Sequence, residues 1–332
     1  MPPSTKPACD PFPVRHVSQI SPLLAERRWL AEGLWLAEGV GILGGAPKSW
    51  KTWLALELAL AVAAGRPALG RFAVPVAGPV LLFCAEDSPP SLRVRFDGLA
   101  LARGLALEDL PLLLLDVAGL RLDSERDLAR LDAAVAQARP RLLVLDPFVR
   151  LARVDENSAA EVSGVLGALR ELQRRHALAV LVVHHARKSP AAHPGQALRG
   201  SSDFAAWGDS NLYVSRRRDG VALAVEHRSA PAPAPLLLRL EADHAPHLVV
   251  VEDLPDGGPE DQPLAELVLS HLASSPRARP TGELTRELRR RKQDVVVALE
   301  ALRAQGRVTR AAQGWVLTDP ATGETPFPRS AP

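Results

Sequence analysis

The residues VGILGGAPKSWKT, at positions 40–52, decide the fold that this sequence predicts. An apolar run over 40–45 reads as a buried strand, a turn rich in Gly and Pro follows, and an apolar helical pattern covers 51–64. A strand, a short loop and a helix in this order form the context in which backbone N–H groups wrap phosphates. The same order is the first step of an α/β domain.

Further apolar runs and helix-length segments alternate along the next part of the chain. The almost continuous hydrophobicity of the runs predicts strands that are buried on both faces of a sheet. Their alternation with helical segments predicts a mostly parallel sheet with helices on both sides. The expected strands are 79–86, 110–116, 141–146 and 179–185, and the expected helices are 51–64, 89–103, 123–138 and 158–176.

The pattern changes after residue 209, where apolar runs follow one another without helices between them. Asp219-Gly220 is a typical hairpin turn. We expect these runs to extend one edge of the sheet with antiparallel strands, so the predicted fold class is α/β with a mostly parallel sheet and antiparallel edge strands. The four runs are 211–218, 221–229, 235–242 and 247–253.

The chain has 332 residues, enough for about two domains. We expect the α/β domain to cover 29–253, after a Pro-rich N-terminal arm at 1–28. A Pro, Gly and acidic linker at 254–262 leads to a small section at 263–318, which reads as three helices and a hairpin. Residues 319–332 are expected to be a disordered tail.

Composition excludes several classes of protein. A net charge of +2 with 47% apolar and 23% charged residues is typical of a globular chain rather than a disordered or fibrous one. Two cysteines are too few for a disulfide framework and favour a reducing compartment. No apolar run reaches the ~18 residues of a membrane span, and the N-terminus lacks an apolar signal core. We expect a cytoplasmic protein without membrane contact.

The loop after residue 45 resembles the pattern G-x-x-x-x-G-K-[ST], in which Lys51 reaches the β- and γ-phosphates and the Thr52 hydroxyl holds Mg²⁺. The chain has only five Lys against 35 Arg, yet two of the five are Lys48 and Lys51. This suggests that a compact point charge is needed here. The predicted nucleotide-binding residues are Gly44, Gly45, Ala46, Pro47, Lys48, Ser49, Trp50, Lys51, Thr52 and Trp53.

Trp50 stands where the pattern has its second Gly. The backbone N–H survives this change, but the indole must find room beside the nucleotide or point away from it. Two alternatives stay open on the sequence alone. The segment could be an ordinary turn before a core helix, or a loop that binds nucleotide poorly.

Polar residues at the ends of other apolar runs complete a predicted catalytic site. Asp146 ends the 141–146 run and is expected to hold Mg²⁺ beside the loop. Glu86 is the candidate that orients and deprotonates the attacking water, although Glu86 and Asp87 could instead cap a helix or lie in a solvated loop. His184 and His185 point to opposite faces of a strand. One of them could bond the γ-phosphate, or both could be satisfied polar groups.

The stretch 187–204 is polar, contains Pro and Gly, and begins with basic residues that include Lys188. It reads as a long functional loop. Arg199, in the sequence LRGSS, is a candidate arginine finger for the nucleotide site of a neighbouring subunit.

Taken together these residues resemble the RecA-like ATPases, and among them the RepA-type hexameric replicative helicases. The resemblance covers about 29–230, and five segments in order carry it: GAPKSWKTWLALELA at 45–59, AED at 85–87, LLVLDPF at 142–148 with Asp155-Glu156-Asn157 after it, VVHHARK at 182–188 and QALRGSSD at 196–203.

The resemblance implies ATP and Mg²⁺ as ligands, Glu86 as base, Asp146 at the metal, His184 and His185 at the phosphate sensor, and Arg199 acting in trans. It also implies a ring, expected to be a hexamer, in which two subunits share each nucleotide site. Single-stranded DNA would then pass through a central channel lined by 187–199, where Lys188 is expected to touch it.

The segment 280–318 resembles a winged helix-turn-helix. Residues 276–310 hold ten Lys or Arg and four Asp or Glu, a local charge of +6. Such a patch favours contacts with the phosphates of duplex or forked DNA. Contacts usually begin at the turn and the start of the recognition helix, where Arg289, Arg290, Arg291 and Lys292 lie. A protein-binding role or a solvated face stays possible for this module.

The function that the sequence favours is a Mg²⁺- and ATP-dependent, ring-forming DNA motor. The alternative is a nucleotide-gated DNA-binding regulator or replication initiation factor that does not unwind DNA. A third reading, which depends on Trp50, is an inactive nucleotide pocket in a structural partner protein.

Overall fold

The computed structural model of the chain describes residues 14–21, 28–156, 158–185, 203–217, 219–253, 264–275, 277–288 and 292–318. Contacts divide it into two compact units, Met1–Asp253 and Leu254–Pro332. Of the expected arm at 1–28, only 14–21 and 28 are described, and they include one 3-10 turn, η1 (Val17–Gln19). The expected linker at 254–262 and tail at 319–332 lie outside the described residues.

One nine-stranded mixed sheet forms the centre of the first unit, with the order β11-β10-β9-β8-β3-β7-β6-β4-β5. Strands β3 to β7 are parallel to their neighbours, as the alternating pattern predicts. The strands are β3 (Val40–Gly45), β4 (Val80–Cys84), β5 (Leu112–Leu114), β6 (Leu142–Asp146), β7 (Ala179–His185), β8 (Ser210–Arg217), β9 (Gly220–His227), β10 (Leu236–Glu241) and β11 (His247–Asp253).

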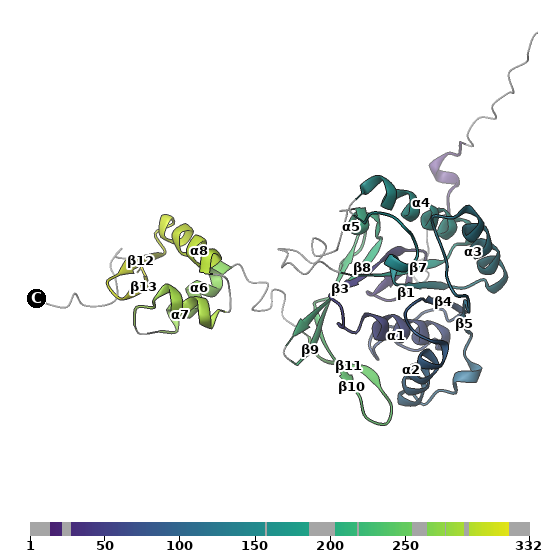
Figure 1. Ribbon diagram of the computed structural model, residues 1–332, viewed down its shortest axis with the longest axis horizontal. Coiled ribbons are helices and arrows are strands. Elements are labelled where there is room, and N and C mark those ends of the chain that lie inside the picture. Colours follow the sequence, from purple (N-terminus) through teal and green to yellow (C-terminus); the bar gives the residue numbers. More distant parts are fainter. Residues whose placement is uncertain are drawn as a thin grey trace, which may run out of the picture. The chain divides into compact units, whose positions relative to one another are not determined.

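Helices cover both faces of this sheet (Figure 1). On one face lie α1 (Lys51–Ala64) and α2 (Pro89–Ala102), and on the other lie α3 (Glu125–Ala138), α4 (Ala159–His176) and the short α5 (Asp203–Trp207). Each layer has its own apolar core against the sheet. Two further 3-10 turns are η3 (Leu107–Asp109) and η4 (Phe148–Arg150).

Two expectations about the strands were wrong in detail. The run 110–116 was expected to be buried on both faces, but β5 is a short edge strand in which Leu113 and Leu114 are 41% and 37% exposed. Hydrophobicity alone does not tell a central strand from an edge strand. The extension after residue 209 begins with β8, which is parallel to β3, and only β9 to β11 are antiparallel.

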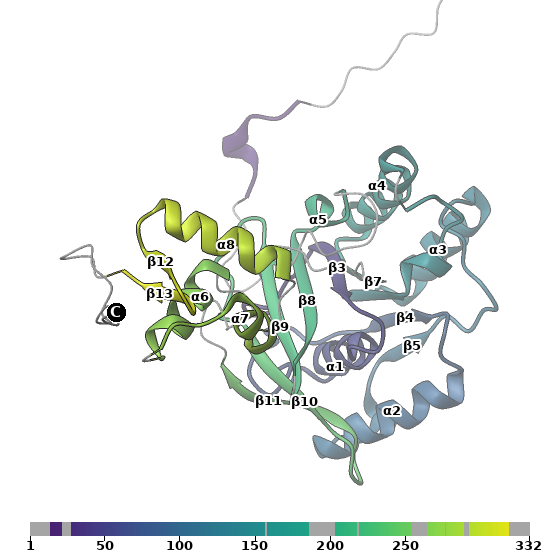
Figure 2. The same cartoon turned by 60° about the vertical axis from the view of Figure 1, so that its left-hand side comes forward.

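The antiparallel part of the sheet bends over the helical layer of α1 and α2. Figure 2 shows the hairpin of β10 and β11 extending toward α2. Pro246 lies in the turn between β10 and β11, close to Gly98 of α2. A Cβ at residue 98 would stand 2.8 Å from the proline Cδ. Leu248 of β11 is buried in the same core as α1. The hairpin therefore helps to hold these two helices in place.

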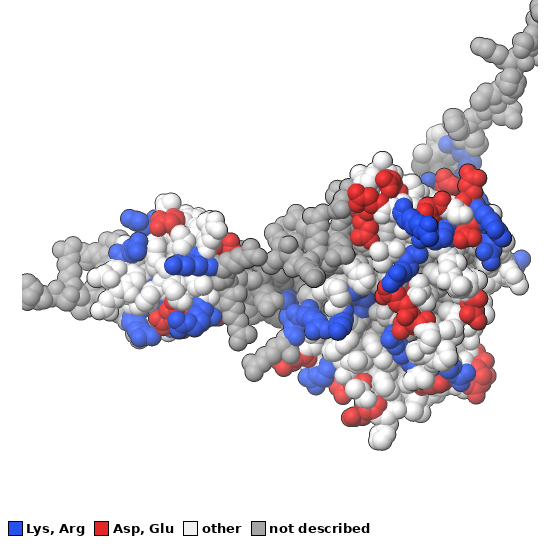
Figure 3. Space-filling model, viewed as in Figure 1, with Lys and Arg blue, Asp and Glu red and all other residues white. Residues whose placement is uncertain are grey.

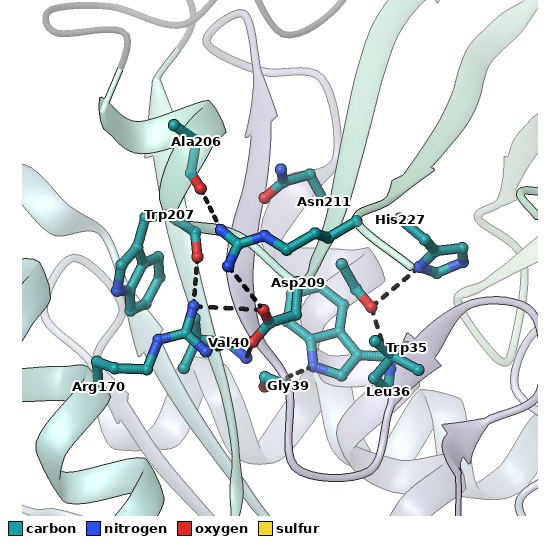
Figure 4. A network of polar contacts seen from close by, with 12 residues as sticks. Trp35, Leu36, Gly39, Val40, Arg170, Ala206, Trp207, Asp209, Asn211 and His227 are labelled. Atoms are coloured by element: carbon teal, nitrogen blue, oxygen red, sulfur yellow. Dashed lines mark hydrogen bonds and ion pairs between the residues drawn. The ribbon is translucent and has the colours of Figure 1, made fainter. Parts of the chain in front are cut away.

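Side chains, rather than backbone pairing alone, join the start of β3 to β8 (Figure 4). The Val40 amide donates to Asp209 Oδ2 at 3.1 Å and the Ile42 amide to Asn211 Oδ1 at 3.0 Å. Arg170 of α4 forms an ion pair with Asp209. A Cβ on Gly41 would stand 1.6 Å from the Ser210 carbonyl oxygen, so only glycine permits this close approach.

A small hairpin that the sequence analysis missed precedes β3. Its strands are β1 (Trp29–Ala31) and β2 (Trp35–Leu36). The Leu36 amide donates to Ser210 Oγ at 3.1 Å, and His227 of β9 hydrogen-bonds both that hydroxyl and the Gly33 carbonyl, at 3.0 and 3.1 Å. The hairpin is thus fixed to the start of β8 and the end of β9.

The second unit contains α6 (Leu264–Ala273), α7 (Thr281–Glu287), α8 (Lys292–Ala304), β12 (Val308–Ala311) and β13 (Gly314–Leu317). The two strands form an antiparallel hairpin. Buried residues from all three helices and both strands make a separate core, which includes Val268, Leu284, Leu299 and Trp315. Three helices and a hairpin were expected at these positions. No helix in the described part of the chain is long and apolar enough to span a membrane.

Candidate nucleotide-binding site

The loop between β3 and α1 leaves a helix N-terminus open toward a cavity. The Ser88, Ser124 and Ser158 side chains cap α2, α3 and α4. At α1 the N-cap residue is Trp50, which makes no side-chain cap bond, and the first turn has no acidic residue. Free N–H groups and the positive end of the helix dipole favour an anion at this position. These features fit a phosphate group.

Trp50 adopts the left-handed conformation that the missing glycine would supply, with φ 61° and ψ 24°. This conformation costs a non-glycine residue roughly 1–2 kcal/mol. The ring is partly buried against the core beside α1 and lines the cavity. Gly45 is required for a different reason, since a Cβ there would stand 2.5 Å from Val214 Cγ2. The backbone therefore keeps the loop conformation although its second glycine is replaced.

Lys51 is the charged group at the centre of the loop and is only 5% exposed. Its Nζ donates to the carbonyl oxygens of Gly45 at 3.0 Å and Ala46 at 2.8 Å, so the loop closes around the ammonium group. Burial lowers the pKa of Lys51 to about 8, while the negative charges of Asp146 and Glu86 act in the opposite direction. A triphosphate would supply the counter-charge that this buried cation needs.

Thr52 and Asp146 meet at the carboxyl edge of the sheet. The Thr52 hydroxyl donates to Asp146 Oδ2 at 2.7 Å, although 94 residues separate the two positions. Burial raises the pKa of Asp146 to about 6, and the bond from Thr52 opposes this rise. A hydroxyl and a carboxylate beside a phosphate site are oxygen ligands of the kind that Mg²⁺ prefers. The residues present therefore fit the metal that the loop pattern implies.

Glu86 lies just past β4, which ends at Cys84 rather than at the expected residue 86. Ser88 caps α2, so neither Glu86 nor Asp87 is its N-cap, but the other alternative, a position in a solvated loop, agrees with the exposed side chain of Glu86. Glu86 is 48% exposed at its side chain and forms an ion pair with Arg150, with Nε and Oε1 3.2 Å apart. Arg150 belongs to η4, directly after β6, and the sequence analysis did not single it out.

A cavity of about 220 Å³ brings these groups together. Its lining residues are Lys48, Ser49, Trp50, Lys51, Thr52, Trp53, Glu86, Arg95, Asp146 and His185. All but Arg95 were expected to be site residues. A larger hollow of about 830 Å³ lies in the second unit, but its lining includes only one ion pair, between Glu266 and Arg307. The chemistry of the lining residues, rather than volume, identifies the candidate site.

A sequence profile of the family described as AAA domain matches residues 8–191, more than half of the chain. The chain belongs to the AAA domain family. A comparison with curated proteins gave no significant match. Among solved structures, a DnaB-like replicative helicase, described with its primase interactions, is 15% identical with a TM-score of 0.51. That match covers 65% of this chain and 58% of the helicase chain.

Two other solved structures are similar at lower TM-scores. One, described as an ATPase domain, is 15% identical at a TM-score of 0.49, covering 65% of this chain and 86% of that one. The RadB recombinase is 20% identical at 0.47, covering 67% and 93%. At such identity the helicase match shows the fold alone, and this AAA domain has the RecA-like α/β fold of P-loop ATPases.

The two histidines of the AAA domain lie on opposite sides of β7. His185 lines the cavity. His184 is 1% exposed, stacks on Phe204 of α5 at 4.1 Å between centroids, and meets Phe148 edge-on at 5.7 Å. Of the two histidines, His185 therefore has a position from which it could contact a bound phosphate, and His184 does not. His184 packs where the end of β7, η4 and α5 meet.

Several expected site residues lie outside the described part of the AAA-domain protein: Lys188, Arg199, Arg289, Arg290 and Arg291. Lys292 is described and is the first residue of α8. Four arginines of the same unit form ion pairs with its glutamates: Arg277, Arg279, Arg303 and Arg307. Figure 3 likewise shows acidic side chains next to basic ones on the visible face of this unit. Its positive charge is thus partly compensated.

Proposed function

We propose that this protein is a Mg²⁺-dependent ATPase that assembles into a ring and acts on DNA as a motor. The observation that carries the proposal is the 2.7 Å hydrogen bond from Thr52 to Asp146, next to Lys51 and the uncapped N-terminus of α1. A hydroxyl, a carboxylate and an ammonium group at one cavity of about 220 Å³ are the parts that phosphoryl transfer from ATP needs.

The proposal gives roles to the phosphate loop, Lys51, Thr52, Asp146, Glu86 and His185. The amides of residues 45–52 bind the phosphates, and Lys51 neutralises charge that develops at the γ-phosphate. Thr52 and Asp146 would hold Mg²⁺, which supplies further charge neutralisation when it is bound. Glu86 accepts a proton from the attacking water once it leaves Arg150. His185, at the end of β7, bonds the γ-phosphate and senses its loss.

The finer parts of the proposal rest on resemblance and on charge. The ring is proposed to be a hexamer in which Arg199 enters the site of the next subunit, and Lys188 contacts single-stranded DNA in the channel. The second unit is proposed to be a winged helix that binds duplex or forked DNA with residues 289–292. The boundaries proposed for these modules are 29–253 for the ATPase domain and 263–318 for the winged helix.

The test compares the wild-type protein with Lys51→Ala. We expect the wild-type protein to hydrolyse ATP, to do so faster with single-stranded DNA, and to displace a strand from a forked duplex. Lys51→Ala should lose turnover and keep its circular dichroism spectrum and unfolding midpoint. Turnover that persists unchanged in Lys51→Ala would show that the site is assigned wrongly.

Molecular mass in solution, with and without a non-hydrolysable ATP analogue, tests the ring. A mass near six chains with the analogue supports it. A fixed monomer leaves Arg199 without a partner site and contradicts it.

A second candidate function is a nucleotide-gated DNA-binding regulator. The ion pair between Glu86 and Arg150 favours it, because a base held by a cation makes hydrolysis slow. Hydrolysis that DNA does not stimulate, together with an absence of strand displacement, would favour the regulator over the motor.

A further inference from the structure

An arginine from a distant part of the chain contacts the backbone of the phosphate loop. Arg216 is an exposed residue near the end of β8, the strand next to β3. Its Nη2 donates to the backbone carbonyl oxygen of Lys48, 168 positions earlier in the sequence. The described lining of the nucleotide cavity includes Lys48 and Ser49 but not Arg216. The arginine therefore contacts the loop from outside the cavity.

The residue that it contacts has an unfavourable backbone conformation. Lys48 has φ 60°, in the left-handed region, as Trp50 has two positions later. A side chain at Cβ makes this region costly for any residue other than glycine. Such a conformation persists only where neighbouring contacts hold it. The bond from Arg216 to the Lys48 carbonyl is a contact of this kind.

The same bond sets the direction of one amide of the loop. The carbonyls of Gly45 and Ala46 accept from side chains of the loop itself and of α1, and among the described side-chain hydrogen bonds only that from Arg216 reaches the Lys48 carbonyl. In a planar trans peptide the N–H group points opposite to the carbonyl. The Ser49 amide, which belongs to the same peptide, is therefore directed away from Arg216. Ser49 is 1% exposed and lines the cavity.

We propose that Arg216 is a positioning residue of the nucleotide site, which holds the Lys48–Ser49 peptide so that the Ser49 amide faces the phosphates of the bound nucleoside triphosphate. The proposal rests on the proposed function, since it takes the 45–52 loop as the phosphate site. An amide that is already directed at the anion needs no ordering when the anion binds, so affinity rises. The phosphates gain this contact before and during hydrolysis alike, so the effect falls on KM rather than on kcat.

The test measures dissociation constants by calorimetry on the full chain, for Mg-ATP and for Mg-tripolyphosphate, which lacks sugar and base. Arg216→Met removes the donor and keeps a long side chain. We expect it to weaken both ligands equally, by about fivefold, as loss of one exposed hydrogen bond does. KM for ATP should rise by the same factor, while kcat and the unfolding midpoint of the free protein stay as in wild type. Arg216→Lys keeps a cationic donor and should bind both ligands within about twofold of wild type.

The matched control is Arg239→Met. Arg239 is an exposed arginine of β10, in the same sheet, and is not part of the described lining of the cavity. The control loses the same charge as Arg216→Met and should bind both ligands as the wild type does. Equal weakening in the two variants would overturn the proposal, because net charge rather than the loop contact would then explain the loss.

A second comparison separates an effect on the backbone from an effect on the Lys48 side chain. Lys48→Met removes the ammonium group and leaves the carbonyl that Arg216 contacts. Adding Arg216→Met to this variant should therefore weaken binding by the same factor as in wild type. A factor close to one would overturn the proposal, because Arg216 would then act through the lysine side chain.

Unchanged binding of both ligands in Arg216→Met would also overturn the proposal, and so would a loss that appears in kcat alone. A wild-type protein that binds neither ligand would instead contradict the proposed function. The failure of the positioning role and the failure of the proposed function are thus distinguishable.

Discussion

Lys51 and Asp146 carry opposite charges in the same cavity, and burial shifts both pKa values toward the neutral form. The pKa of Lys51 is lowered to about 8 and that of Asp146 is raised to about 6. Each of them therefore titrates nearer to neutral pH than an ordinary lysine or aspartate. Both shifts can be measured, one through ligand binding and the other through stability.

Nucleotide affinity should depend on pH through Lys51. A bound triphosphate stabilises the ammonium form, so above pH 8 the free protein must take up a proton when it binds ATP. We expect the affinity for Mg-ATP to fall by about twofold or less from pH 7 to 8, and then toward tenfold per pH unit between pH 8 and 9.5. Calorimetry in two buffers of different ionisation enthalpy counts the protons.

Lys51→Arg is the control for this titration, because a guanidinium group stays protonated throughout the range. Its weaker binding should not vary with pH above 8. A level wild-type affinity up to pH 9.5 would contradict the lowered pKa of Lys51.

Asp146→Asn should stabilise the protein at neutral pH while it abolishes Mg-dependent turnover. The folded-state pKa of Asp146 lies above its unfolded value of 3.8, so its contribution to stability is complete below pH 3.8 and is lost as pH rises through 6. At pH 7 we expect the variant to be about 1–3 kcal/mol more stable than wild type. The gain should vanish near pH 4, as urea unfolding at the two pH values would show. Asp97→Asn, at an exposed position, should give no such gain.

Arg150→Ala should raise the basal rate of ATP hydrolysis, because it frees Glu86 to bind the attacking water. Both partners of this ion pair are about half exposed or more, which limits the pair to about 1 kcal/mol and the gain to about fivefold. Steady-state turnover without DNA measures it. Arg153→Ala, in the same loop, is the control and should leave the rate unchanged. A lower rate in Arg150→Ala would mean that Arg150 positions Glu86 rather than restrains it.

At the scale of elements, an ion pair inside the protein joins α1 to α2. Glu57 of α1 is fully buried, accepts from the Leu69 amide at 2.7 Å and pairs with Arg103, the C-cap residue of α2. Burial raises the pKa of Glu57, and Arg103 opposes that rise. The pair connects the two helices that flank the candidate site.

Arg103→Ala should destabilise the fold by about 3 kcal/mol, since it leaves a buried carboxylate without its cation. The double variant Glu57→Gln/Arg103→Ala has no buried charge and should recover part of this loss. Urea unfolding at pH 7 measures both. Equal losses in the single and double variants would mean that packing, rather than charge, holds the helices together.

The elements around the phosphate loop were predictable because local signals mark them. Continuous apolar runs and the phosphate-loop pattern predict β3, β6, β7 and α1 to within a residue or two. The edge position of β5 and the parallel direction of β8 depend on strand order, which no local pattern contains. The β1–β2 hairpin consists of two very short strands, and contacts with Ser210 and His227 hold it in place. Distant contacts of this kind leave no periodic signal.

The candidate site was predictable for the same reason, except where it depends on contacts between elements. Lys51, Thr52 and Asp146 follow from the loop pattern and from a strand end. Arg95 lies in the middle of a helix and Arg150 in a short turn, so the sequence around each of them gives no indication of a site. Only the structure places them beside Trp53 and Glu86.

At the scale of the whole molecule, the first and second units have separate cores, and DNA binding is proposed for the second. Lys292→Ala should lower duplex affinity and reduce the slope of log K against log salt by about 0.9, the value for one phosphate contact. Fluorescence anisotropy of the full chain at several salt concentrations measures this slope. Arg307→Ala is the matched control, because Arg307 already pairs with Glu266 at 3.1 Å. An unchanged slope in Lys292→Ala would favour a protein-binding role for this unit.

The position of β3 in the sheet determines how the chain can be cut. This strand lies between β7 and β8, and Asp209 and Asn211 satisfy two of its amides. The family match ends at residue 191, before β8 begins. A protein truncated at that boundary would lack β8, so β3 would become an exposed edge strand. Such an edge promotes aggregation. Expression of the first unit should therefore extend through residue 253, because the family match at 8–191 ends before the sheet is complete.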